Sequence, residues 1–112
     1  MASEDDVRAI ALSLPETEER PSYGTPGFRV KGKFLIRLRE EDSLVVPIDT
    51  IERDFLMESD PATFYITDHY RDWPYVLVRL SKVDREELRD LLERAWRSKA
   101  PKRLLQAHDA GR

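Results

Sequence analysis

The stretch "FRVKGKFLIRLR", residues 28–39, decides the fold, because apolar and basic side chains alternate in it on both sides of Gly32. Alternation with a period of two is typical of a β-strand that is buried on one face, and a glycine between two such runs predicts a tight turn. We therefore expect an antiparallel hairpin. Its apolar core face is predicted to comprise Phe28, Val30, Phe34, Ile36 and Leu38. Its mostly basic opposite face is predicted to comprise Arg29, Lys31, Leu35, Arg37 and Arg39.

Three further runs extend the predicted sheet beyond this hairpin. Residues 44–48, "LVVPI", follow a predicted turn at residues 40–43, and their proline is typical of a strand end or a sheet edge. The segments "TFYIT" (63–67) and "YVLVRL" (75–80) are rich in aromatic and β-branched residues, as strands are. Prolines and glycines punctuate residues 21–27, which we expect to form an irregular approach to the first strand of the hairpin.

Helix-start signals lie before three apolar segments with helical spacing. Pairs with the spacing of a capping box are Ser3 with Asp6, Asp49 with Glu52 and Asp84 with Glu87. The first predicted helix ends before Pro15, and the third carries five apolar residues on one face, beginning at Leu88.

Two shorter helices are also predicted. The helix after Asp49 should turn Ile51, Phe55 and Leu56 toward the core. Pro101 is predicted to be the first residue of a last helix that ends near Ala107, since a missing N–H has no cost at that position.

The order of elements predicts an α+β fold in a single domain spanning residues 1–112. The strands are joined by short turns, so the sheet should be mostly antiparallel, with the helices packed on one of its faces. The other face of the sheet is then not covered by helices, and its side chains are of interest for function.

The composition excludes several classes of protein. The chain has 112 residues, of which 40% are hydrophobic and 37% charged, and no apolar run reaches the length of a membrane span. Its acidic N-terminus does not resemble a secretory signal, and the absence of cysteine excludes disulfides and thiolate metal sites. We expect a soluble cytoplasmic protein without a cofactor or a metal site, and a monomer by default.

The net charge of −3 conceals a basic block, since residues 29–39 contain five basic residues and no acid. On the outer sheet face we place Arg29, Lys31, Arg37, Arg39 and Arg79, with Leu35 and Leu77 between them. This face is either an anion-binding surface or an ordinary solvated one. Lys102 and Arg103 fall in the first turn of the last helix, where the macrodipole disfavours cations, so an acidic neighbour or a bound phosphate should compensate them.

A second candidate site lies in "TDHYRDWPYVLVRL", residues 67–80. His69, Trp73 and Tyr75 have the chemistry to line a pocket for an anion or an aromatic compound. Alternatively, this segment is only a turn between two strands, in which His69 makes a local hydrogen bond. No pattern of a catalytic motif is present, so we assign no catalytic residue.

The chain resembles the MmcQ/YjbR family of small bacterial proteins. The resemblance rests on "DVRAIALSLPETEE", "YGTPGFRVKGKFLIRL", "HYRDWPYVLVRL" and "LLERAWRSKAPKRL", in that order along the chain. It implies a CyaY-like, double-wing α+β fold, for which DNA binding has been proposed. Arg79, Lys102 and Arg103 match basic positions of the family, whereas Asp72 stands where relatives often have glycine.

Three hypotheses about function follow. The first is a module that binds DNA or another anionic partner through the basic sheet face. The second is a protein-interaction or regulatory adaptor, docking through exposed Leu35 and Leu77. The third is a small-ligand binder or enzyme centred on His69.

Overall fold

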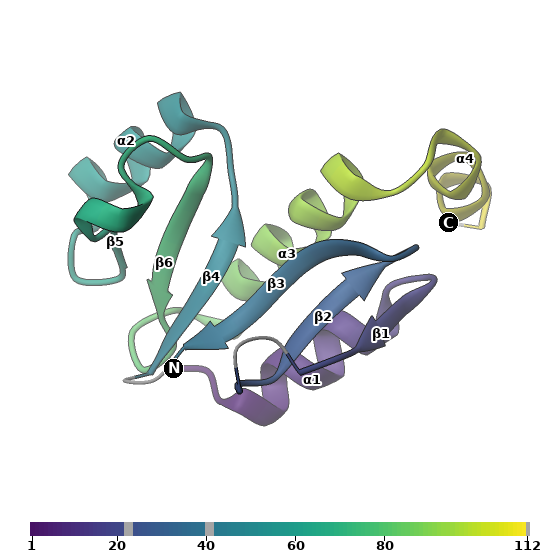
Figure 1. Cartoon of the computed structure of the whole chain (residues 1–112), viewed down its shortest axis with the longest axis horizontal. Helices are drawn as coiled ribbons and strands as arrows, with labels where there is room; N and C mark the ends of the chain where they lie inside the picture. The colour runs from purple at the N-terminus through teal and green to yellow at the C-terminus, as the bar shows by residue number, and fades with distance from the viewer. Residues whose placement is uncertain (22–23, 40–41, 112) are drawn as a thin grey trace.

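Among the residues that the computed structural model describes, 1–21, 24–39 and 42–111, six strands form one antiparallel sheet in the order β1-β2-β3-β4-β6-β5 (Figure 1). The strands are β1 (Thr17–Glu19), β2 (Gly27–Val30), β3 (Lys33–Arg39), β4 (Ser43–Pro47), β5 (Phe64–Tyr65) and β6 (Tyr75–Arg79). The helices are α1 (Glu4–Ser13), α2 (Thr50–Ser59), α3 (Arg85–Lys99) and α4 (Lys102–Ala110), and a 3-10 turn, η1, spans Asp68–Tyr70.

The helices α1 and α3 cover one face of the sheet, as the strand pattern predicts. Figure 1 looks onto the other face, and both helices run behind the strands in this view. We call the face turned away from α1 and α3 the open face. The α+β architecture with an antiparallel sheet and helices on one face is therefore confirmed.

The predicted hairpin is present as β2 and β3. Lys31 and Gly32 have φ angles of 51° and 80°, which fits a two-residue turn whose left-handed conformations match the twist of the strands. The short edge strand β1 was not predicted, because residues 17–19 lack apolar alternation; it pairs Thr17 with Val30 and Glu19 with Phe28. The turn predicted at residues 40–43 lies partly outside the described residues.

A bulge in β3 changes which side chains reach the core. Phe28 pairs with Ile36 but Arg29 pairs with Phe34, so Leu35 is an extra residue on β3. Leu35 and Ile36 are both fully buried in the main core, whereas Phe34 packs on the open face. Strict alternation placed Phe34 in the core and Leu35 outside, and it was wrong because the bulge interrupts the period of two.

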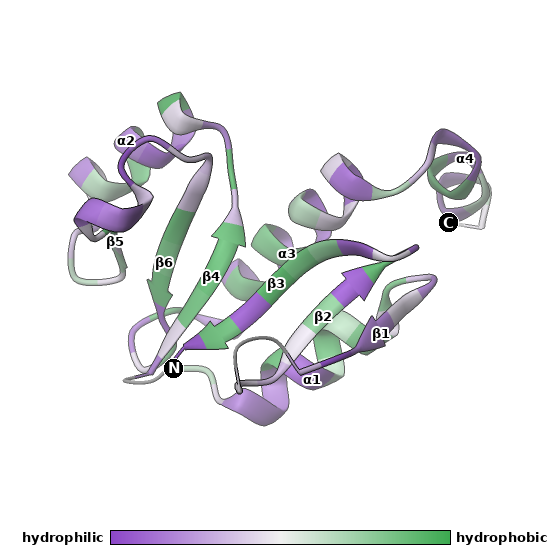
Figure 2. Cartoon of the chain, in the orientation of Figure 1, coloured by the Kyte–Doolittle hydropathy of each residue, from purple (hydrophilic) through white to green (hydrophobic). Residues whose placement is uncertain are grey.

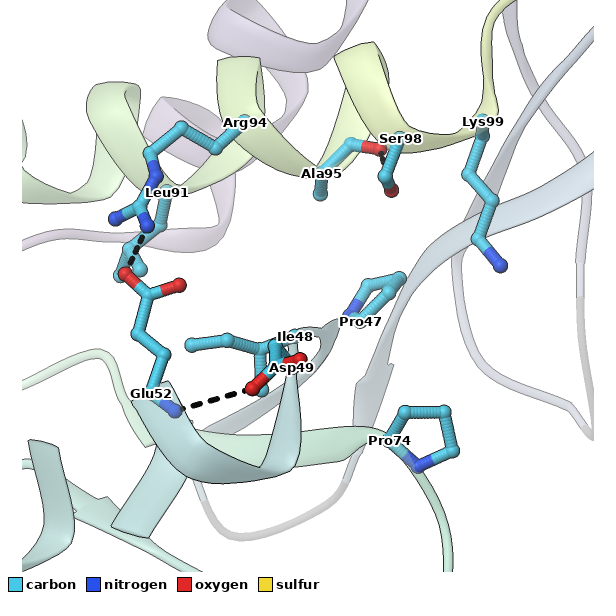
Figure 3. A pocket seen from close by; sticks show the side chains of 10 residues that line it. All are labelled: Pro47, Ile48, Asp49, Glu52, Pro74, Leu91, Arg94, Ala95, Ser98 and Lys99. Carbon is cyan, nitrogen blue, oxygen red and sulfur yellow. Dashed lines mark hydrogen bonds and ion pairs between the residues drawn. The ribbon is translucent and has the colours of Figure 1, made fainter. Parts of the chain in front are cut away.

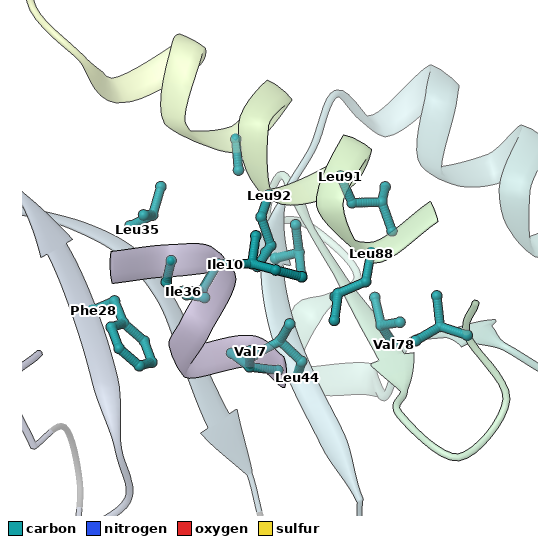
Figure 4. Close-up of a cluster of buried hydrophobic side chains, with 14 of the residues drawn as sticks. Val7, Ile10, Phe28, Leu35, Ile36, Leu44, Val78, Leu88, Leu91 and Leu92 are labelled. Atoms are coloured by element: carbon teal, nitrogen blue, oxygen red, sulfur yellow. The ribbon is translucent and has the colours of Figure 1, made fainter. Parts of the chain in front are cut away.

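The main core lies between the sheet and the two helices behind it (Figure 4). Its fully or almost fully buried side chains include Val7, Ile10, Leu44, Val78, Leu88, Leu91, Leu92 and Trp96. The five α3 residues predicted to face inward are all buried. Figure 2 shows β4 and β6 as apolar along most of their length, which is typical of strands covered on both faces.

The helix starts follow the capping signals of the sequence. Ser3 accepts a hydrogen bond from the Asp6 N–H at 3.2 Å while its own N–H donates to Asp6 at 3.0 Å, which completes a capping box. Asp49 and Asp84 cap the N-termini of α2 and α3. Pro101 is the N-cap of α4 and not its first helical residue, and α4 continues to Ala110.

The second helix presents only part of the predicted face to the core. Leu56 is half-buried and packs against the core as predicted, whereas Ile51 and Phe55 are 81% and 69% exposed. The side chain that α2 buries is Arg53, which is only 5% exposed. Among the described residues no helix combines the length and apolar character that crossing a bilayer requires.

Candidate functional site

The open face carries four arginines on three strands. Arg29 lies on β2, Arg37 and Arg39 lie on β3, and Arg79 lies on β6. Each alternates with core-facing neighbours, so the predicted outward phase of these four is correct. Lys31 does not join them, because it lies in the β2–β3 turn with its Nζ 3.1 Å from the carboxylate of Glu16.

Aromatic rings gather on the same face, where β3 and β4 diverge. The two strands pair only from Arg37 to Arg39 of β3 in the described chain, so Phe34 lies beyond the paired region. The rings of Phe34 and Tyr75 meet edge to face with centroids 6.0 Å apart, across the end of β4. Tyr70, from η1, meets Tyr75 at 6.2 Å, and His69 meets Tyr70 at 4.9 Å, again edge to face.

These basic and aromatic side chains enclose a hollow of about 540 Å³, which we call the aromatic hollow. Its lining consists of Arg29, Phe34, Arg37, Val45, His69, Tyr70 and Tyr75. Arg29 and Arg37 of the basic sheet face and His69 and Tyr75 of the second candidate site, which the sequence suggested separately, therefore line the same hollow. None of these described lining residues carries a carboxylate.

The floor of the aromatic hollow consists of side chains that contact one another across the sheet. Val45 and Leu77 are buried, and Tyr70 packs over them with 8% of its surface exposed. The Arg37 Nη2 donates to the Tyr70 hydroxyl at 3.1 Å, and the Arg39 guanidinium lies 5.9 Å from the centre of the same ring. Tyr70 thus joins η1 to β3.

Arg79 extends the basic surface away from the hollow. Its guanidinium lies 3.9 Å from the centre of the Tyr65 ring and donates to the carbonyl of Ala62 at 3.1 Å. The Tyr65 hydroxyl in turn contacts the buried hydroxyl of Ser43. Arg39, Ser43 and Arg79 are cross-strand neighbours, so the two arginines belong to one row.

Arg53 holds the loop that forms one wall of the site, and sequence reasoning missed it. Its Nη1 donates to the carbonyl oxygens of Trp73, Tyr70 and Tyr75 at 2.7, 3.2 and 3.3 Å, and its Nη2 donates to that of Arg71 at 3.2 Å. A buried arginine needs such partners, because an unpaired buried charge is very costly. No sequence signal marked Arg53, since a charged residue in a short helix is normally exposed.

Three further candidate residues, besides Lys31, Arg39 and Arg79, do not line the aromatic hollow. Trp73 is 58% exposed and does not line it. Lys102 and Arg103 begin α4, which packs against α3 through a ring contact of His108 with Trp96 at 4.8 Å. Neither makes an ion pair with an acidic residue in the described part of the chain.

The surface suggested for an adaptor is not exposed. Leu35 is fully buried by the bulge, and Leu77 is fully buried beneath Tyr70. The imidazole of His69, which was expected to make a local hydrogen bond if the segment is only a turn, is exposed and hydrogen-bonds to no described residue. Asp72 does not need a glycine-like backbone, because it is not among the described residues with positive φ.

A second hollow, of about 400 Å³, lies between α2 and α3 (Figure 3). Its apolar lining comes from Pro47, Ile48, Pro74, Leu91 and Ala95. An ion pair between Arg94 and Glu52 closes one end of this hollow, and Lys99, the last residue of α3, lies at the other end. Its charged groups are of mixed sign. Among the described residues no cluster of histidine and acidic side chains is suited to a metal ion.

Comparisons with known proteins place the chain in a family. The sequence model of the YjbR family matches residues 12–98. The chain belongs to the YjbR family. Two uncharacterized proteins, from Mycobacterium bovis and Mycobacterium tuberculosis H37Rv, are each 29% identical to it over 96% of this chain and 95% of the relative.

The fold of this YjbR-family protein also resembles a solved structure. The crystal structure of Deinococcus radiodurans protein DR2400, a DUF419 domain, matches with a TM-score of 0.75 and 24% identity. The match covers 86% of this chain and 77% of that one, and it shows the fold alone. All residues that line the aromatic hollow fall within the stretch matched to the YjbR family, whereas Lys102 and Arg103 fall outside it.

Proposed function

We propose that this YjbR-family protein is a cytoplasmic nucleic-acid-binding module whose open face binds backbone phosphates. The observation that supports this proposal best is the convergence of Arg29 and Arg37 on the aromatic hollow, with Arg39 and Arg79 beside it. Guanidinium groups bind phosphate oxygens through charge-assisted, often bidentate hydrogen bonds. The ligand class is therefore a polyanion with several phosphates.

Three of the four arginines on the open face lack an acidic partner in the described part of the chain. Arg29, Arg39 and Arg79 make no ion pair with an acidic residue of the described chain. The acid opposite Arg29 in the strand register is Glu18, and its carboxylate is paired with the Nε of Arg20 at 3.1 Å. Arg29 and Arg79 donate to backbone carbonyl groups, of Gly32 at 3.3 Å and of Ala62 at 3.1 Å, so none of the three has to give up an ion pair with a described residue to bind phosphate.

The acidic balance of the whole chain is compatible with this local charge. Acids elsewhere pair with arginines of α1 and α3, on the other side of the sheet, as Glu19 does with Arg8 and Asp109 with Arg97. A net charge of −3 nevertheless repels a polyanion at long range. We expect modest affinity with strong salt dependence, since contacts to about three phosphates give a slope near −2 to −3 on a log–log plot.

An enzyme centred on His69 is less well supported. A general base needs an orienting partner, and the described residues that line the hollow offer His69 no carboxylate. The adaptor hypothesis has lost the surface on which it depended, because Leu35 and Leu77 are buried.

The test is a paired charge reversal read by fluorescence anisotropy with a labelled oligonucleotide at two salt concentrations. The double variant Arg29→Glu with Arg39→Glu should lose binding by at least about tenfold and reduce the salt slope. The matched control is Lys102→Glu with Arg103→Glu, which changes the net charge equally on α4 and should keep most of the affinity. Equal losses in both variants, or no binding by the parent protein at low salt, would contradict the proposal.

A further inference from the structure

Building on the proposed function, we infer that the aromatic hollow receives an unpaired base, so that the ligand is single-stranded nucleic acid. The basic residues account for phosphates but not for the rings among them. A site for phosphates alone has no need of an apolar hollow lined by Phe34, Tyr70 and Tyr75. Rings between arginines are the usual combination of surfaces that bind single strands.

The rings are arranged so that a planar base can pack against them. Phe34 and Tyr75 meet at an interplanar angle of 79°, and Tyr70 and Tyr75 meet at 77°, so neither pair is stacked face to face. Phe34 and Tyr75 are also only half-buried. A planar base entering the hollow gains contact with aromatic surface that the protein does not cover itself.

The polar groups around the rings suit the edge of a base. The Tyr70 hydroxyl, the exposed imidazole of His69 and the Arg37 guanidinium all line the hollow. The Tyr70 hydroxyl accepts from Arg37 and keeps its own O–H as a donor, and the imidazole of His69 adds a donor and an acceptor for a base edge. None of the described lining residues carries a carboxylate that would repel the phosphate after the base.

The phosphates on either side of an inserted base have a path along the sheet. Arg37 and Arg39 are alternate residues of β3, so their Cα atoms are about 6.6 Å apart. Arg39 and Arg79 lie in one cross-strand row with Ser43 between them, which separates them by about 10 Å. A strand that leaves the hollow past Arg37 can therefore pass from one arginine to the next.

A duplex fits this face less well. Its bases are stacked and paired, and moving one into a pocket costs a few kcal/mol that an unpaired strand does not lose. Recognition in a major groove normally uses an inserted helix or β-ribbon. The open face has instead the short turn η1, while α1 and α3 lie on the opposite face (Figure 1).

Three labelled ligands distinguish base insertion from backbone binding alone. They are a thymidine 15-mer, a mixed-sequence 15-base-pair duplex, and a 15-mer of the same backbone with abasic sites throughout. With the parent protein we expect the thymidine 15-mer to bind at least about tenfold more tightly than either other ligand. This comparison needs no variant, so it does not depend on the folding of one.

Two substitutions then test the ring of Tyr75 itself. Tyr75→Leu keeps an apolar side chain but removes the aromatic surface. It should weaken binding of the thymidine 15-mer about tenfold and leave the affinity for the abasic 15-mer unchanged. Tyr75→Phe keeps the ring and should bind the thymidine 15-mer within about twofold of the parent. Circular dichroism and urea unfolding of both variants check that the fold is retained.

Failure of this inference is separable from failure of the proposed function. If all three ligands bind equally and all lose affinity on Arg29→Glu with Arg39→Glu, the open face binds phosphates and base insertion is wrong. Tighter binding of the duplex than of the thymidine 15-mer also overturns base insertion. If the parent protein binds none of the ligands at low salt, both proposals fall.

Discussion

The buried guanidinium of Arg53 donates a hydrogen bond to the carbonyl oxygen of Trp73 at 2.7 Å and thereby ties α2 to the loop before β6. That loop also carries His69 and Tyr70, which line the aromatic hollow. A single side chain from outside the sheet thus holds one wall of the candidate site in place.

Replacing Arg53 by methionine should destabilise the fold by about 2–5 kcal/mol. The change leaves buried carbonyl oxygens of the loop without their donor, and each unsatisfied acceptor costs about 1–3 kcal/mol. Urea unfolding measures the difference. Arg89→Met is the control, because Arg89 is exposed on α3 and should change stability by about 0.5 kcal/mol or less. Equal stability of the two variants would show that the loop does not depend on Arg53.

The bulge in β3 predicts the effect of truncating Leu35. Leu35→Ala should cost about 2–5 kcal/mol, since the side chain is fully buried and its removal leaves a cavity. The control is Ile51→Ala, because Ile51 is 81% exposed and its loss should be within about 0.5 kcal/mol of neutral. Thermal or urea unfolding of both variants suffices. If Leu35→Ala did not change the free energy of unfolding, Leu35 would be exposed as strict alternation predicts, and the bulge would be wrong.

The two histidines should respond in opposite ways. His69→Ala should leave the free energy of unfolding within about 0.5 kcal/mol of the parent, because the exposed imidazole has no hydrogen-bond partner among the described residues. It should weaken oligonucleotide binding a few-fold. His108→Ala should instead lower stability by about 1 kcal/mol through loss of the contact with Trp96, and it should not affect binding. The reverse pattern would remove His69 from the site.

Replacing Glu87 by glutamine should increase the stability of the fold in a pH-dependent way. Partial burial, followed by repulsion from Asp60, Asp84 and Asp90, raises the pKa of Glu87 above its ordinary value. A raised pKa means that the folded state binds the proton more tightly, so ionisation of Glu87 opposes folding at neutral pH. Glu87→Gln should therefore be more stable than the parent at pH 7, and the difference should shrink as the pH falls through the ordinary glutamate pKa of about 4.3.

Because solvent screens the charge of Glu87, we expect this gain to be about 0.5 kcal/mol or less, as for other substitutions at the protein surface. Glu86→Gln is the control, because Glu86 lies in the same first turn of α3 and loses the same helix-dipole interaction. Melting temperatures of both variants at pH 7 and pH 3 measure the effect. A difference between the two that is unchanged at pH 3 would show that ionisation of Glu87 is not its cause.

The sequence by itself determined those features that depend on neighbours a few residues away. The period of two around Gly32 predicts the β2–β3 hairpin, and the side chains of Ser3, Asp49 and Asp84 predict three helix starts. Such features follow from strand pleating, turn geometry and capping, which act within one turn or one strand. The outward phase of Arg29, Arg37, Arg39 and Arg79 belongs to the same class, and the structure reproduces it.

Only the tertiary structure decided which side chains meet. The bulge that exchanges Leu35 for Phe34 depends on the pairing of β3 with β2. The burial of Arg53 depends on carbonyl groups 17 to 22 residues away in the chain. Arg37 and Tyr70 are 33 residues apart, yet they share the aromatic hollow because strand order and the position of η1 bring them together. Register and packing are set by the whole core, so no local pattern carries this information.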